Sequence, residues 1–403
     1  MQFFKDWSIS AFSAGFVAVL VGFTSSIAIV FQAAQAFGAT PEVMASWMWA
    51  IGLGMGLCTL VPSLWWRKPV MVAWSTPGAA VLASAGMAGG FHMGDAVGAF
   101  MMCAALIVVA GATGWFERLM DRIPVAIASA LLAGVLARVG LSAFTAAQTS
   151  LPLVVLMLLT YLVGKRLLPR YAVPLTLAVA IVFVAFNHGF LQTDIQYGLT
   201  LPVWVTPVFS VSAFVSLALP LFIVTMASQN LPGVAAIKAA GYGDERANGG
   251  DAGIPISRTI TLTGLCTLVL APFGAFSLNL SAITAAICMG PEAHADPKRR
   301  YTAAVSCGGL YVLVGLFGAT IIGVLTAFPK ELVAAIAGLA LLGSIAGGLR
   351  VALDKDVDRE AAIITFLVTL SGVTVAGVGS AFWGVVAGAV ALAVQHWKAP
   401  QTR

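Results

Sequence analysis

Long apolar stretches, separated by short polar loops, run through almost the whole chain. Many of them reach or approach the roughly 20 apolar residues that a helix needs to cross a bilayer. There are fourteen such segments, at about 10–37, 43–65, 70–88, 96–114, 123–142, 151–168, 172–190, 209–231, 257–272, 276–289, 301–325, 330–349, 361–378 and 381–397. The pattern predicts an all-α polytopic membrane protein with fourteen transmembrane segments.

The distribution of charge supports this count. Only 9% of the 403 residues are charged and 60% are apolar, which excludes a soluble domain. Of the 21 Lys and Arg residues, all but Arg138 and Lys330 fall on one side of the fourteen segments. Because basic loops face the cytoplasm, both termini are expected there. The net charge of +5 reflects these loops and does not indicate a nucleic-acid partner.

Two segments are interrupted in their middle. Trp74-Ser75-Thr76-Pro77-Gly78 breaks the third segment, and Phe-Ser-Leu-Asn-Leu-Ser at 276–281 breaks the tenth. Each is expected to be a short extended strand followed by a half-helix, capped by Thr76 in the third and by Asn279 or Ser281 in the tenth. Seven segments per half invert the second half relative to the first. The breaks therefore fit a seven-plus-seven inverted repeat, in which they mark a transporter's binding site.

The broken segments predict a site for an anion. A helix N-terminus carries roughly half a positive charge and several free N–H groups, and two that face one another suit a monoanion such as a carboxylate. Trp74 and Phe276 flank the breaks and are expected to sandwich a flat apolar body. The alternative is that the breaks are kinks and that the aromatic rings are ordinary packing.

Other polar residues inside the segments extend this site. Thr24 and Ser25 lie near the middle of the first segment, where their hydroxyls either bind substrate or bond back to carbonyls of their own helix. Ser228, Gln229 and Asn230 end the eighth segment. They are site residues if they face the bundle interior, and otherwise they mark the membrane boundary.

Acidic side chains are missing from the segment centres, and the sequence offers no metal-binding motif. All 16 Asp and Glu residues lie in loops or at segment ends, and the 4 His and 5 Cys are too scattered for a metal site or a disulfide framework. An enzyme needs a nucleophile with its base, paired carboxylates or a metal cluster. We therefore expect no enzyme activity, no metal and no cofactor.

Three strings identify a resemblance to a known family: Ser-Thr-Pro-Gly-Ala at 75–79, Ser-Gln-Asn-Leu-Pro-Gly at 228–233 and Asn-Leu-Ser-Ala-Ile-Thr-Ala-Ala at 279–286. Together with the two broken segments, they resemble the bacterial benzoate/proton symporter (BenE) family over essentially the whole chain. That family is similar in fold to the uracil and xanthine nucleobase permeases and to sulfate and bicarbonate transporters.

The resemblance implies one transporter unit of two domains. A core domain, about 1–115 and 209–325, moves like an elevator against a gate domain, about 116–208 and 326–403, and the gate domain often forms a homodimer. The implied substrate site comprises Thr24, Ser25, Trp74, Ser75, Thr76, Gly78, Ser228, Gln229, Asn230, Phe276, Ser277, Asn279 and Ser281. Nucleobase permeases place carboxylates in the eighth and tenth segments. The amides of Gln229, Asn230 and Asn279 favour an anionic ligand here.

We therefore predict a secondary active transporter of an aromatic monocarboxylate, benzoate or a close relative, in the bacterial inner membrane. The alternative is a nucleobase or inorganic-anion permease of the same fold, and a membrane enzyme or a passive channel fits less well. The family implies proton symport, yet no carboxylate lies at mid-membrane. Either a peripheral group titrates, with Glu292 and Asp95 ahead of His92, or the substrate itself carries the proton.

Overall fold

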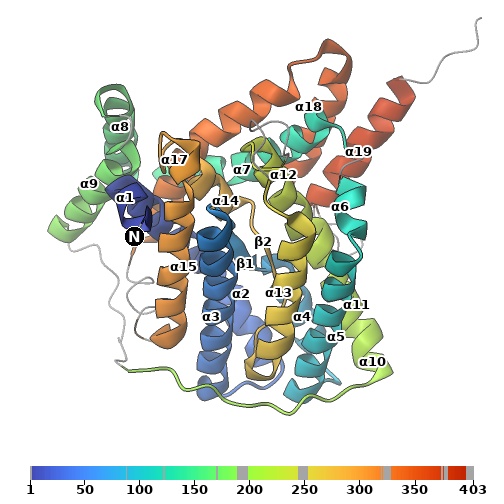
Figure 1. Cartoon of the computed structure of the whole chain (residues 1–403). Coiled ribbons are helices and arrows are strands. Elements are labelled where there is room, and N and C mark those ends of the chain that lie inside the picture. Colours follow the sequence, from blue (N-terminus) through green and yellow to red (C-terminus); the bar gives the residue numbers. More distant parts are fainter. Residues whose placement is uncertain are drawn as a thin grey trace, which may run out of the picture.

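Helices make up nearly all of the structure, a computed structural model (Figure 1). It describes residues 2–87, 89–120, 123–168, 171–187, 198–243, 253–318, 320, 328–373, 375 and 380–395. Within these ranges the strands β1 and β2 form one two-stranded ribbon. In Figure 1 this ribbon lies near the centre of the molecule, surrounded by helices.

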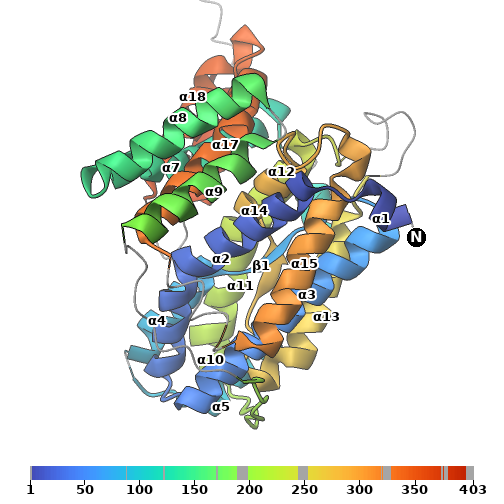
Figure 2. The same cartoon turned by 90° about the vertical axis from the view of Figure 1, so that its left-hand side faces the viewer.

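The helices form two groups that lie against each other (Figure 2). The larger helix group contains α1 (Gln2–Asp6), α2 (Ile9–Ala36), α3 (Pro41–Trp66), β1 (Val72–Trp74), α4 (Thr76–Met87), α5 (Met93–Ala112), α6 (Trp115–Met120), α10 (Val211–Ala213), α11 (Leu219–Thr225), α12 (Leu231–Ala239), α13 (Ile256–Leu270), β2 (Leu278–Leu280), α14 (Ile283–Met289) and α15 (Tyr301–Leu316). The smaller helix group contains α7 (Val125–Thr145), α8 (Leu151–Leu167), α9 (Ala172–Phe186), α17 (Lys330–Ala352), α18 (Arg359–Ser371) and α19 (Ser380–Gln395).

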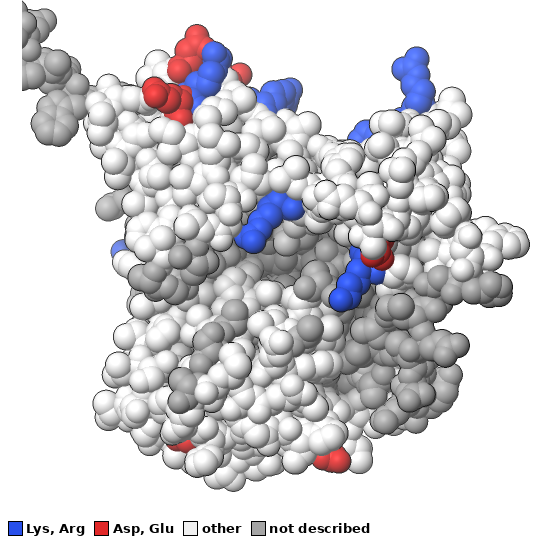
Figure 3. All heavy atoms as spheres, turned by 180° about the vertical axis from the view of Figure 1, so that it is seen from behind, with Lys and Arg blue, Asp and Glu red and all other residues white. Residues whose placement is uncertain are grey.

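Several helices are long and apolar enough to cross a membrane. They span Pro41–Trp66, Met93–Ala112, Val125–Gln148, Val211–Ala239, Ile256–Phe273 and Lys330–Ala352. Figure 3 shows one face of the molecule on which charged side chains are few and lie mainly in the upper part, with a hollow between its upper and lower parts. The chain is therefore a mostly helical multi-pass membrane protein, as predicted. The total of fourteen segments and their inverted repeat stay predictions.

Glycines bring α3 and α15 into close contact. A Cβ added to Gly52 would lie 2.6 Å from the backbone nitrogen of Gly315, and one added to Gly308 would lie 2.8 Å from the backbone nitrogen of Leu60. Small residues allow helix backbones to approach closely in membranes, where packing drives helix association. This contact fixes the positions of Met55 on α3 and Tyr311 on α15, which matter for the site below.

The two broken segments meet in the central ribbon. β1 and β2 pair antiparallel, with Val72 opposite Leu280, Ala73 opposite Asn279 and Trp74 opposite Leu278. A helix follows each strand, α4 after β1 and α14 after β2. The structure therefore confirms that each broken segment is a short strand followed by a short helix. The antiparallel pairing places the starts of the two helices at opposite ends of the ribbon.

The helix caps differ in part from the prediction. Ser75, and not Thr76, caps α4, since its Oγ accepts the N–H of Gly78 at 3.0 Å. Thr76 is instead the first residue of the helix, because the extended chain already ends at Trp74. At the second break Ser281 Oγ accepts the N–H of Thr284 at 3.4 Å, which confirms one of the two predicted caps.

Candidate functional site

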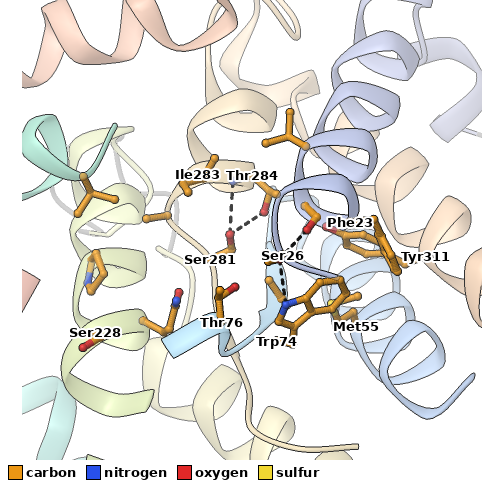
Figure 4. A pocket seen from close by; sticks show the side chains of 17 residues that line it. Phe23, Ser26, Met55, Trp74, Thr76, Ser228, Ser281, Ile283, Thr284 and Tyr311 are labelled. Carbon is orange, nitrogen blue, oxygen red and sulfur yellow. Dashed lines mark hydrogen bonds between the residues drawn. The ribbon is translucent and has the colours of Figure 1, made fainter. Parts of the chain in front are cut away.

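A cavity of about 130 Å³ lies beside the ribbon, between α2, α12, α14 and α15 (Figure 4). It brings together five of the predicted site residues, namely Trp74, Thr76, Ser228, Gln229 and Ser281. They come from both broken segments and from the π-helical turn Met226–Asn230, which joins α11 to α12. Such turns inside longer helices often occur at functional sites, because they re-aim the side chains that they carry.

Polar side chains in the cavity form two short hydrogen-bonded sets (Figure 4). Trp74 Nε1 donates to Ser26 Oγ at 3.2 Å, and Ser26 Oγ donates to Gly22 O at 2.9 Å. In the other set, Thr284 Oγ1 donates to Ser281 Oγ at 2.7 Å, and the same oxygen caps α14. Because Ser281 Oγ accepts both of these bonds, its own hydrogen remains available to a ligand.

Aromatic and aliphatic side chains supply the rest of the lining. Phe23 meets Trp74 edge to face, with ring centroids 4.8 Å apart, and lies 5.8 Å from the ring of Tyr311. Met55 and Ile283 add aliphatic surface. An apolar cavity of roughly 150 Å³ in another protein binds benzene. The cavity here therefore has the size and lining for one aromatic ring.

No Lys, Arg, Asp, Glu or His is among the described residues that line the cavity. Positive potential comes instead from backbone groups. Thr76 lines the cavity as the first residue of the twelve-residue helix α4, where N–H groups lack helical partners and the helix dipole is positive. The described lining thus offers hydroxyls, one side-chain amide and a helix start to an anion, without a formal charge.

Other predicted residues lie behind the cavity wall and hold the ribbon in place. Asn230 Oδ1 accepts the N–H of Leu280 at 3.0 Å, which ties the π-helical turn to β2. Ser277 O accepts the N–H of Ser75 at 3.1 Å and so extends the ribbon by one bond. A Cβ added to Gly78 would lie 2.7 Å from Leu221 Cδ1, so glycine allows α11 to approach α4.

Asn279 occupies an intermediate position. It lies directly opposite Ala73, which lines the cavity. Its Nδ2 donates to Ser277 O at 2.8 Å, whereas its Oδ1 is buried without a hydrogen bond in the structure. A buried acceptor without a partner costs free energy. Of the two predicted caps of α14, Asn279 is therefore not the cap. It lies next to the lining residue Ala73 but is not itself among the described lining residues.

Phe276 lies away from the cavity. It is fully buried against Trp47 and Phe100, with ring centroids 5.7 and 5.9 Å away. The predicted sandwich of a flat ligand between Trp74 and Phe276 is therefore wrong. The reason is local, since Ser277 has a φ of +37°, which turns the chain just before β2 and directs Phe276 into this separate aromatic cluster.

Sequence reasoning missed the other twelve described lining residues, and the aromatic and hydroxyl-bearing ones among them are Phe23, Ser26, Thr284 and Tyr311. Ser26 immediately follows the predicted pair Thr24 and Ser25. That pair lies in α2, and its side chains are outside the described part of the structure.

The three candidates for proton coupling lie in two places. Glu292 follows α14 and forms an ion pair with Lys165 of α8, with Oε1 2.9 Å from Nζ. This pair joins the larger helix group to the smaller one. Asp95 and His92 lie together at the start of α5, where Asp95 Oδ2 accepts the backbone N–H of His92 at 2.9 Å. Within the described residues no group of three His, Cys, Asp or Glu could hold a metal ion.

The family model described as benzoate membrane transport protein matches residues 5–394. The chain belongs to this family. It is 47% identical over 390 residues to the inner membrane protein YdcO of Escherichia coli (strain K12), with 97% of each chain covered. It is 38% identical over 388 residues to the benzoate membrane transport protein of Acinetobacter baylyi, with 96% of this chain and 95% of that protein covered.

Among solved structures, SLC26A9 has the same fold, with a TM-score of 0.52 at 12% identity over 97% of this chain and 66% of that chain. The family resemblance predicted from the sequence is thus confirmed. The family is one of membrane transport proteins, so the chain is not an enzyme.

Proposed function

We propose that this benzoate-family protein is a secondary active transporter of an aromatic monocarboxylate, benzoate or a close relative. One observation carries the proposal: a cavity of about 130 Å³ combines an aromatic lining with hydroxyl donors and no charged side chain among the described residues. The name of the Acinetobacter baylyi relative supports the same substrate class. A neutral nucleobase would not need the helix start, and a small inorganic anion would not need the aromatic lining.

The cavity suggests how the ligand is oriented. The ring packs against Phe23, Trp74 and Met55, where burial of apolar surface favours binding. The carboxylate meets the hydroxyls of Thr76 and Ser281 and the backbone N–H of Thr76 at the start of α4. Hydrogen bonds to a charged group are each worth about 1.5–3 kcal/mol, so these donors can hold the carboxylate without a cation.

The composition of the lining supports elevator-like movement. Of the 17 described lining residues, only Val135 comes from the smaller helix group. The larger helix group would therefore carry the substrate almost alone while it slides past the smaller one. We propose that these groups, apart from α6, correspond to a core domain, about 1–115 and 209–325, and a gate domain, about 116–208 and 326–403, in a seven-plus-seven inverted repeat of fourteen segments.

A second cavity, of about 210 Å³, supports a path to the cytoplasm along the same boundary. It is lined by Ser129 and Leu132 of α7 and by Ala286 and Met289 of α14. Both helices also contribute to the first cavity, through Val135 and Ile283–Thr284. On α7 the residues 129, 132 and 135 recur every three positions and so share one helix face. This face would guide the substrate between the two cavities.

The remaining features of the proposal concern coupling and assembly. We propose proton-coupled uptake, with Glu292 the first candidate for the coupling group because its ion pair crosses between the two helix groups. We also propose a bacterial inner-membrane protein, a location that the name of the Escherichia coli relative supports, with both termini in the cytoplasm. A homodimer through the gate domain rests on the family resemblance alone.

Uptake of radiolabelled benzoate into proteoliposomes, with and without an inward proton gradient, tests this proposal. We expect saturable uptake that unlabelled benzoate blocks and uracil or sulfate does not. Thr76→Val, which removes one hydroxyl with little change in shape, should weaken benzoate binding by about tenfold or more. Thr113→Val at the exposed end of α5 is the matched control. Uptake of uracil or sulfate in place of benzoate would overturn the substrate assignment.

A further inference from the structure

A much larger cavity lies at the C-terminal end of α3, away from the candidate site. Its volume is about 630 Å³, and Trp66, Arg67, Lys68, Tyr242, Lys298 and Arg299 line it together with Asp6, Asp296, Pro297 and Tyr301. They come from α1, the end of α3, the segments that follow α12 and α14, and the start of α15. By the distribution of basic residues this is the cytoplasmic side.

The cavity holds more positive than negative charge. Its two carboxylates, Asp6 and Asp296, both lie 3.6 Å from Nε of Arg299. That leaves Arg67, Lys68 and Lys298 without an ion-pair partner in the described part of the chain. Burial raises the pKa of nearby Tyr242 to about 12, so its hydroxyl stays neutral and adds no negative charge. The described lining thus has four cations and two carboxylates, which gives the cavity a net positive charge.

Arg67 reaches this position through an unusual backbone conformation. It ends α3 with a φ of +52°, in the left-handed region that residues with a Cβ rarely adopt. Strained residues of this kind persist where the surrounding structure requires them, and they cluster at functional sites. The left-handed turn is followed directly by Lys68, so Arg67 and Lys68 both line the cavity beside Trp66.

Exposed aromatic residues place the cavity at the depth of lipid headgroups. Trp65, next to the lining residue Trp66, is 83% exposed, and Trp7 is 41% exposed. Tryptophan concentrates at the membrane–water boundary. Exposed apolar side chains continue from there along the first turns of α2, with Ile9 and Phe12, and along the last turns of α3, with Leu64. An acyl chain can lie on this surface while its headgroup enters the cavity.

We propose that this cavity binds the phosphate headgroup of an anionic phospholipid from the cytoplasmic leaflet. Three cations around one space match a phosphate oxyanion, and basic pockets between transmembrane helices on the cytoplasmic side are suited to such headgroups. The neighbouring exposed Trp65 and apolar surface favour a lipid over a soluble phosphate compound. This site is separate from the candidate substrate cavity and shares none of its described lining residues.

The test is a lipid titration of the purified full-length protein by native mass spectrometry. Phosphatidylglycerol is compared with phosphatidylcholine of the same acyl chains, and glycerol phosphate is the soluble probe. A cation near a membrane surface contributes about fivefold in affinity for anionic lipid. Lys68→Gln should therefore lose about fivefold for phosphatidylglycerol, and the triple variant Arg67→Gln, Lys68→Gln, Lys298→Gln about a hundredfold.

Control variants distinguish a specific lipid site from the general attraction of anionic lipids to basic loops. Lys355→Gln removes a cation from the smaller helix group on the same predicted side of the membrane and should leave the titration unchanged. Benzoate binding by every variant checks the fold. The proposal is overturned if the triple variant retains parental affinity for phosphatidylglycerol, or if Lys355→Gln weakens binding as much as Lys68→Gln. Glycerol phosphate that competes at equal concentration would also overturn it and assign a soluble phosphate ligand.

Discussion

Replacing Gln229 by Glu tests whether the cavity holds an anion. Gln229 lines the cavity from the π-helical turn Met226–Asn230. The substitution keeps the length and shape of the side chain and exchanges an amide for a carboxylate. If the bound ligand is a carboxylate, Gln229→Glu places two like charges inside one small space in which no described residue carries a positive charge.

The size of the cavity sets the magnitude of the effect. A sphere of about 130 Å³ is roughly 6 Å across, so the two carboxylates would lie about 4–6 Å apart. At that separation, with an effective dielectric constant near 20, unit charges repel by roughly 3–4 kcal/mol. That energy corresponds to a loss of about a hundredfold to several hundredfold in affinity. A bound neutral ligand would escape this penalty.

The effect has a predicted pH dependence. Bound benzoate favours the protonated form of the introduced carboxyl, because the neutral form escapes the repulsion between the two like charges. The introduced carboxyl therefore becomes protonated as the pH falls. Free benzoate in solution stays ionised to a lower pH, because the pKa of benzoic acid is near the ordinary pKa of Glu. Benzoate affinity of Gln229→Glu should thus be lowest at pH 8 and recover as the pH falls towards 5.

Equilibrium binding of benzoate to purified protein, by isothermal titration calorimetry or scintillation proximity, measures this loss. Gln229→Met keeps the side-chain length without a charge, and it should lose far less affinity. Gln148→Glu adds the same charge at an exposed position beyond α7 and should bind as the parent does. Parental affinity of Gln229→Glu at pH 8 would refute a carboxylate in this cavity, and an equal loss in Gln229→Met would refute the electrostatic cause.

Two further predictions concern coupling and topology. Glu292→Gln should reduce benzoate accumulation driven by an inward proton gradient more than Asp95→Asn or His92→Ala, because only Glu292 forms an ion pair between the two helix groups; full accumulation in all three would leave the substrate as the proton carrier. Single cysteines introduced into a cysteine-free background should react with an impermeant maleimide from one side only, and labelling of 298–300 from outside would contradict the fourteen-segment topology. The positions are 67–68 and 298–300, expected to react from the cytoplasm, and 38–42, expected to react from outside.

The sequence predicted the broken segments well because their signals are local. A Thr-Pro pair after extended-compatible residues, and a Ser three residues before Thr284, are features that one stretch of chain provides by itself. The cap of α4 was misplaced by one residue, to Thr76 from Ser75, because both residue types can cap. Where the strand stops decides between them. The end of β1 is set by its pairing with β2, some 200 residues further along the chain, in which Trp74 lies opposite Leu278.

Side-chain direction was harder to predict than segment identity. Trp74 and Phe276 both flank breaks, yet only Trp74 faces the cavity, since the turn at Ser277 redirects Phe276. Tyr311 was missed although a signal existed. Gly308 and Gly315 lie seven residues apart on the face of α15 that contacts α3, and Tyr311 lies between them on that same face. One glycine pattern therefore marks both the helix contact and a cavity-lining residue.

The position of the Glu292–Lys165 ion pair limits how transport can be coupled. If the larger helix group carries the substrate past the smaller one, Nζ of Lys165 and Oε1 of Glu292 must separate in each cycle. The lysine side chain is 44% exposed, so solvent screens the pair and its contribution is at most about 1 kcal/mol. Breaking it would change the ratio of the two conformations by only about fivefold. The ion pair can therefore bias the movement of the two helix groups, but it is too weak to prevent that movement. Protonation of Glu292 would make separation of the groups easier, although separation does not require it.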